Sequence, residues 1–158
     1  MLVGSRHHQR GISLVELILF IVIISVAVTG IMLVMNRVTG HSADALLRKQ
    51  SLAIAESMLE EIQLQNFAKP AGGFAGPFTP ATRTSFDCVT DYNGFTTAGI
   101  FTVNNTAIAG LGRYRITVAV VPAALGTIAA VNSLLITVSV TDPKGNLPVQ
   151  ISGYRTAY

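Results

Sequence analysis

The chain has few of the residues that usually mark a catalytic or metal-binding protein. Among its 158 residues there is one cysteine, no tryptophan and three histidines, and only 12% of the residues are charged. The single cysteine, Cys88, excludes a disulfide within this sequence. No Ser-His-Asp arrangement and no cysteine–histidine ligand set is present, and Gly110-Leu111-Gly112 lacks the rest of a nucleotide loop. We therefore expect no enzyme activity, no catalytic residue, no resident metal and no cofactor.

The chain also lacks a basic surface of its own. The formal net charge is +3, but Arg6 and Arg10 lie in the first 11 residues, and the remainder carries nine basic against eight acidic side chains. The short run Arg113-Tyr114-Arg115 falls in a predicted strand, where it is more typical of a solvent-facing edge than of a nucleic-acid platform. No nucleic-acid partner is predicted.

The chain does have one long apolar run, at residues 12–35. All of its 24 residues are apolar or small except Glu16, Ser25 and Thr29, and about 20 apolar residues suffice to cross a bilayer as a helix. The preceding arginines favour a cytoplasmic amino end and a remainder, after Met35, that lies across the membrane. A carboxylate inside such a run costs roughly 2.5–3.5 kcal/mol on insertion scales, so Glu16 needs a partner or a function.

Two modes of processing fit this run. A secretory signal peptide would be cut after the small residues 25–27, leaving a chain that begins at Val28. Cleavage after Gly11 would instead keep the apolar helix, with a new amino group on Ile12 one helical turn from Glu16 and within reach of a neighbouring helix. The second mode explains the carboxylate as an assembly contact. A protonated Glu16, or one that faces an unrelated membrane partner, stays open.

Residues 11–17, Gly-Ile-Ser-Leu-Val-Glu-Leu, resemble the signature of the type IV prepilin superfamily. The resemblance implies that prepilin peptidase cleaves between Gly11 and Ile12, that Ile12 is N-methylated, and that Glu16 pairs with a neighbouring subunit's amino terminus. Two departures are an isoleucine where phenylalanine or methionine is commoner, and Leu33 where many major pilins have a proline.

Beyond the apolar run the helical pattern continues as an amphipathic helix. Leu47, Ile54, Met58 and Ile62, with Ala55 and Leu59 beside them, recur at steps of three, four and seven, which predicts one buried face. We expect a single helix from near Ser13 to near residue 66, whose second half packs against the chain's own head. Prolines and glycines between residues 67 and 80 end it.

The segment 85–95 carries the most polar cluster of the remaining chain. Asp87, Asp91 and Asn93 could offer oxygen ligands to calcium, but the spacing of an EF-hand is absent. Asn93-Gly94 is a strong turn signal, which favours a structural role for the segment. Cys88 stands without a histidine or a second cysteine, so we expect a buried or idle thiol. Calcium binding here stays open.

Alternating apolar residues mark the carboxyl-terminal part as strands. The pattern at residues 114–120 and 134–140 predicts two half-buried antiparallel strands, a turn at 142–146 and a last strand from Leu147 onward. A shorter strand is expected near residues 100–103. The predicted fold is α+β and type IV pilin-like, with one long amino-terminal helix packed on a small antiparallel β-sheet.

The expected organisation has five segments. They are a leader at 1–11, a membrane-spanning or filament-core half-helix at 12–35, an amphipathic half-helix at 36–66, an αβ-loop region at 67–99 and a β-sheet head at 100–158. Short motifs in the head are similar to minor pilins of the mannose-sensitive haemagglutinin (MSHA) pilus, the MshD-like group. The motifs are the Asp-Tyr-x-Gly core near Asp91, the turn at Asp142 and the closing Tyr154-Arg155.

This resemblance implies a minor pilin that serves adhesion or motility. Its partners would be prepilin peptidase, other pilin subunits, the inner-membrane assembly machinery and membrane lipid. It would lie as a single-pass protein in the bacterial inner membrane and then in a pilus on the cell surface. The alternatives are a type II secretion pseudopilin and a single-span anchored binding protein that never polymerises.

Overall fold

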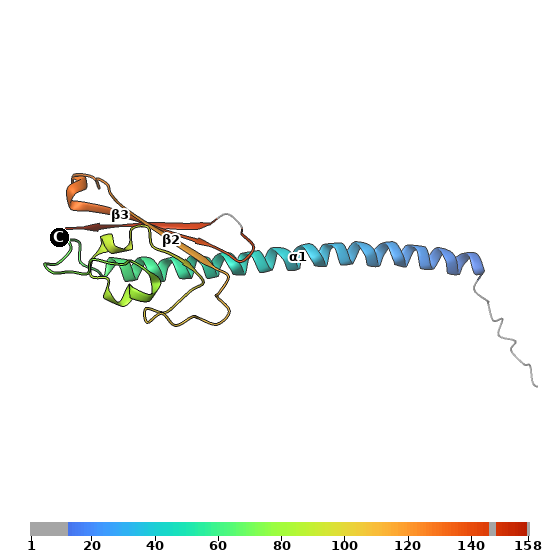
Figure 1. The fold of residues 1–158 in the computed structure, drawn as a ribbon. Helices are drawn as coiled ribbons and strands as arrows, with labels where there is room; N and C mark the ends of the chain where they lie inside the picture. The colour runs from blue at the N-terminus through green and yellow to red at the C-terminus, as the bar shows by residue number, and fades with distance from the viewer. Residues whose placement is uncertain (1–12, 146–147, 158) are drawn as a thin grey trace, which may run out of the picture. The chain divides into compact units, whose positions relative to one another are not determined.

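The computed structural model describes residues 13–145 and 148–157, without the side chains of residues 41–43. The helices and strands are α1 (Leu14–Gln63), β1 (Thr96–Ala98), β2 (Arg115–Pro122), β3 (Ser133–Thr141) and β4 (Val149–Thr156), shown in Figure 1. Three short 3-10 helices join them: η1 (Pro80–Ser85), η2 (Val89–Tyr92) and η3 (Ala130–Asn132). The chain divides into two compact units, Met1–Asp44 and Ala45–Tyr158.

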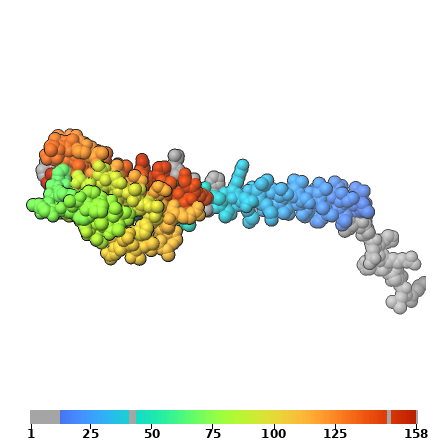
Figure 2. All heavy atoms as spheres, viewed as in Figure 1, coloured from blue at the N-terminus to red at the C-terminus, as the bar shows by residue number. Residues whose placement is uncertain are grey.

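In the first unit, α1 presents an apolar surface on all sides. Every side chain from residue 13 to residue 40 is exposed, as the blue-to-cyan part of Figure 2 shows on one face. The hydroxyls of Ser25, Thr29 and Thr39 donate to the carbonyls four residues earlier, at 2.6, 2.7 and 2.9 Å. Because the Ser25 and Thr29 hydroxyls are satisfied within the helix, hydrocarbon can surround the apolar run up to residue 35 without stranding a hydroxyl donor. Among the described residues, α1 is the one helix long and apolar enough to cross a membrane.

The second unit packs the rest of α1 on a four-stranded antiparallel sheet of order β1-β2-β3-β4. This confirms the predicted α+β, pilin-like architecture. The predicted helical stripe is also confirmed: Ala55, Met58 and Ile62 are buried, and Leu47 and Ile54 are half-buried against the same core. Burial of such a face stabilises the helix far more than its intrinsic propensity does.

The two central strands form the other layer of the core. Side chains alternate between buried and exposed along β2, and between buried and half-buried along β3. The buried members are those that the alternation predicted: Tyr114, Ile116, Val118 and Val120, and Leu134, Ile136, Val138 and Val140. The register pairs Ile116 with Val140 and Val118 with Val138, so apolar residues face the helix in pairs across the strands.

The prediction of a strand at residues 100–103 is wrong. The first strand is β1, which consists of the three residues directly before Gly99. Phe101 makes only an isolated bridge with Ala107. The Gly99 N–H donates to the Tyr114 carbonyl at 2.7 Å and forms the last bond of the β1–β2 ladder, and the φ of 98° at Gly99 then turns the chain away from β2. The chain then folds back on itself, and the Ile108 N–H donates to the Ile100 carbonyl at 2.9 Å. A positive φ at a glycine thus overrides the strand propensity of the residues after it.

The last strand and its turn follow the prediction. The Gly145 N–H donates to the Asp142 carbonyl at 3.0 Å, and the Lys144 N–H donates to Asp142 Oδ1 at 2.8 Å. β4 then pairs with β3 from Val149 onward. Leu147, the expected start of this strand, lies outside the described residues.

Candidate functional site

The first candidate site is the amino-terminal turn of α1. The Leu17 N–H donates to the Ser13 carbonyl at 3.1 Å, and Glu16 lies in the first helical turn. A negative charge is favoured there, because the unpaired N–H groups of a helix start carry partial positive charge. Gly11 and Ile12, the predicted cleavage and methylation positions, lie outside the described residues.

Glu16 is chemically isolated among the described residues of its unit. It is the one charged residue between positions 13 and 36. Its neighbours Leu14, Val15 and Leu17 are 74%, 64% and 51% exposed, so no part of the described chain covers this turn. Within the described residues Glu16 has no ion-pair partner. An ionised carboxylate on an apolar helix is costly in low dielectric without a complementary charge, and the described chain supplies none.

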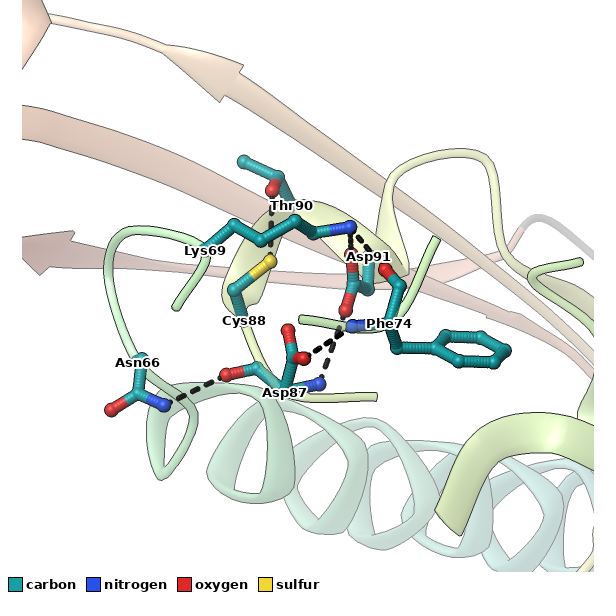
Figure 3. A network of polar contacts seen from close by, with 7 residues as sticks. All are labelled: Asn66, Lys69, Phe74, Asp87, Cys88, Thr90 and Asp91. Atoms are coloured by element: carbon teal, nitrogen blue, oxygen red, sulfur yellow. Dashed lines mark hydrogen bonds and ion pairs between the residues drawn. The ribbon is translucent and has the colours of Figure 1, made fainter. Parts of the chain in front are cut away.

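The second candidate site is the polar network of the αβ-loop region, drawn in Figure 3. The Lys69 ammonium pairs with Asp91 Oδ1 at 2.9 Å and also donates to the Phe74 carbonyl. The backbone N–H of Asp87 donates to the other Asp91 oxygen at 3.1 Å. Asp87 Oδ2 in turn accepts the Phe74 N–H at 2.6 Å. The network therefore ties residues 69–74 to the start of η2.

Charge compensation within this network is local. Burial by itself would raise the pKa of Asp91, but the hydrogen bonds from Lys69 and from the Asp87 backbone lower it below its ordinary value. The hydrogen bond to Asp91 raises the pKa of Lys69. Both groups therefore stay ionised at neutral pH.

The network brings together Asp87 and Asp91, two of the three residues for which calcium binding was left open, but not Asn93. Ligand atoms of Asp87, Cys88 and Asp91 lie within 4.8 Å of one another. However, Lys69 and two backbone N–H groups already use three of the four carboxylate oxygens, and Asn93 instead accepts the Val120 N–H at 3.1 Å. The arrangement supports a structural fastening of the loop.

Cys88 belongs to the same structural assembly. Its side chain is buried, and its sulfur lies 3.1 Å from Thr90 Oγ1. Burial raises the pKa of the thiol, so the nucleophilic thiolate is disfavoured. This agrees with the expectation of a buried thiol and gives no support to a nucleophile.

A third polar cluster was not expected from the sequence. Arg83 is only 8% exposed, and its guanidinium binds the Glu61 carboxylate through two nitrogens, with Nε to Oε1 at 2.6 Å. The Tyr92 hydroxyl donates to the same Oε1 at 2.8 Å, and Arg83 Nη1 donates to the Phe101 carbonyl at 3.2 Å. Burial, reinforced by the Glu61 charge, raises the pKa of Tyr92 far above its ordinary value. No sequence period relates residues that lie 22 positions apart, so only the fold reveals the pair.

This cluster lies at the side of an open groove of about 390 Å³. The groove runs between α1, including Ile54, Ser57 and Glu61, and the folded-back segment that includes Val103 and Ile108. Its lining is mostly apolar, and its two charged side chains are paired with each other. Nothing in this chemistry specifies a substrate or a reaction.

Comparison with known proteins identifies the amino-terminal segment. Residues 6–32 match the family described as the prokaryotic N-terminal methylation motif. No curated protein and no solved structure matches the chain. The matched residues include Arg10, the predicted cleavage position at Gly11 and Ile12, Glu16 and most of the apolar run. The match, together with a long amino-terminal helix on an antiparallel sheet, supports a type IV prepilin-like protein, of a family that is structural and is processed by prepilin peptidase.

Proposed function

We propose that the chain is a minor pilin, a non-catalytic subunit that is assembled into a type IV pilus of the MSHA kind or that primes its assembly. The observation that carries the proposal is the exposed apolar surface of the part of α1 that lies in the first unit. This part is an apolar helix with no cover from the described chain and with a single carboxylate in its first turn. Such a surface needs lipid before assembly and other helices after it.

The proposed processing follows from the same turn. Removal of residues 1–11 between Gly11 and Ile12 leaves an amino group near Glu16, and N-methylation of Ile12 keeps that group positively charged. Each mature chain then offers a cation and an anion one helical turn apart, so staggered neighbours can neutralise each other within an apolar filament core. Before assembly the head would lie in the periplasm, with the amino end cytoplasmic.

The experiment that tests this proposal replaces Glu16. Glu16→Ala should leave membrane insertion intact, because it removes a charge from the span, but should abolish incorporation into filaments sheared from cells. Asp44→Ala, which removes a carboxylate farther along α1, serves as the matched control and should assemble normally. Normal incorporation of the Glu16→Ala chain would refute the pairing mechanism.

Two other functions make different predictions for the same cells. A type II secretion pseudopilin would depend on Glu16 equally but would be recovered with secretion components rather than with a retractable pilus. An anchored binding protein would never enter a filament, whatever residue stands at position 16. The head contains no cysteine pair, which fits a minor subunit or a pseudopilin better than a main adhesive subunit with a disulfide-closed loop.

A further inference from the structure

The two edges of the sheet differ in length and in protection. β1 forms one edge with three residues, and β4 forms the other with eight. Natural proteins usually guard a long edge with lysine, proline, a bulge or a covering segment, because its backbone groups can pair with another chain. From Val149 to Tyr154, β4 has no charged residue and no proline, and it pairs with β3 without a bulge.

The hydrogen-bonding pattern shows which backbone groups of β4 point outward. The Ala157 N–H donates to the Asn132 carbonyl at 3.1 Å, which extends the β3–β4 register by one pair. In an antiparallel ladder every second pair is hydrogen-bonded, so odd-numbered residues of β4 bond to β3 and even-numbered ones face away. Within the described part of the chain, the outward backbone groups of Gln150, Ser152 and Tyr154 have no hydrogen-bond partner.

The side chains of these residues also leave the edge accessible. Gln150, Ser152 and Tyr154 are exposed, and Tyr154 is 38% exposed. The odd-numbered face lies against α1, because a Cβ at Gly153 would meet Leu59 at 3.2 Å and Gln63 at 2.5 Å. The helix therefore covers one face of β4 and leaves its outer face and its edge uncovered.

We propose that β4 pairs with β4 of a second copy of this chain, antiparallel and about a two-fold axis through Ser152. This register sets Ser152 opposite its own counterpart and Gln150 opposite Tyr154 of the other copy, so outward groups meet outward groups. Each of these three pairs exchanges two hydrogen bonds. Because residues 149–154 are uncharged, no like charges lie opposite each other, and the edge complements itself.

The direction of β4 relative to α1 determines how two chains joined through β4 are oriented. Gly153 lies beside Leu59 and Gln63, and Arg155 Nε approaches the Gln65 carbonyl at 3.5 Å, so β4 runs in the same direction as this part of α1. The two-fold pairing therefore places these two helix segments in opposite directions. A two-fold contact also closes on itself and cannot propagate. It links chains of opposite polarity, as two adjacent antiparallel filaments would present them, and is separate from polymerisation through Glu16.

Cysteine cross-linking tests the proposed register. Hydrogen-bonded antiparallel pairs have Cα atoms about 5.5 Å apart, within the range that a disulfide spans. The full-length chain with Ser152→Cys should form a covalent dimer under mild oxidation. Thr84→Cys, an exposed control on η1, should not, and the native Cys88 is buried in both variants. Equal dimer yields from the two variants, or cross-links from position 152 to other proteins only, would overturn the proposal.

A second variant removes the outward donor and keeps the fold. Ser152→Pro deletes an N–H that faces away from β3, and proline is tolerated at such positions of edge strands. Loss of the dimer in light scattering, with an unchanged thermal midpoint of the head, is the expected result. Gln150→Ala changes a side chain but no backbone donor and should keep the dimer. A dimer that persists in Ser152→Pro would contradict pairing through this edge. Neither result depends on leader cleavage or on filament assembly.

Discussion

The two parts of α1 have opposite relations to the rest of the chain. Residues 13–40 expose every side chain, whereas Ser51, Ala55, Met58 and Ile62 of the same helix are buried against the head. Up to residue 35 the first part is apolar or small apart from one carboxylate and two hydroxyl residues, Ser25 and Thr29, and the second part is apolar on a single face. The difference shows that one continuous helix can carry two kinds of surface, one completed by its own sheet and one that needs lipid or other chains.

The largest loss of stability is expected from a substitution in the core of the head. Phe86 contacts Phe74, Phe78, Tyr92 and Phe95 with ring centroids 4.9–6.1 Å apart. Phe86→Ala should lower the free energy of unfolding of the head by about 3–5 kcal/mol, because it leaves a cavity among these rings. Near-ultraviolet circular dichroism of the tyrosines during denaturation measures this, since all four tyrosines lie beyond residue 90. Membrane insertion through the first unit should be unchanged. A shift under 1 kcal/mol would be inconsistent with this core.

The next effect concerns the buried ion pair. Arg83→Met should cost about 3 kcal/mol of head stability, because it strands the Glu61 carboxylate in a partly buried site. The double variant Glu61→Met with Arg83→Met should recover much of that loss, since both charges are then removed. If the double variant is as unstable as the sum of the two single variants, the pair is not coupled as described.

A smaller effect should appear only in acid. The folded-state pKa of Asp91 is lowered, so its ionised form stabilises the head above the unfolded-state pKa, and this contribution is lost as the pH falls through the folded-state value. Asp91→Asn should therefore reduce stability at neutral pH and flatten its decline below about pH 4. Denaturation midpoints of both chains between neutral and acid pH check this. Parallel curves for the two proteins would exclude a role for the Lys69–Asp91 pair.

The smallest effect is expected in the first unit. Leu33 is 65% exposed, so Leu33→Ala should change the unfolding free energy of the head by less than about 0.5 kcal/mol. The same tyrosine signal measures it. A loss as large as that of Phe86→Ala would mean that the apolar half of α1 is completed by the chain itself, and the comparison between the two parts would fail.

The sequence predicted what depends on period and composition. Steps of three and four gave Met58 and Ile62 as buried helix residues, and alternation gave Ile136 and Val138 as buried strand residues. A single carboxylate in an apolar run drew attention to Glu16, and the motif match covers that position. These signals are local, so they can be read without knowledge of which segments meet.

What could not be predicted depends on contacts between distant segments. The strand expected at residues 100–103 failed because Gly99 turns the chain away from β2 after Ala98. The ion pair of Glu61 with Arg83 and that of Lys69 with Asp91 join segments whose spacing follows no period. The polar cluster near Asp87 suggested oxygen ligands for a metal, and only the fold showed that Lys69 and backbone N–H groups occupy three of its four carboxylate oxygens.

The mass of the mature amino terminus tests the central claim most directly. The account predicts that the chain recovered from its native membrane begins at Ile12 and carries one additional methyl group. A chain that begins at Met1, or at Val28 after an ordinary signal-peptide cut, would contradict it.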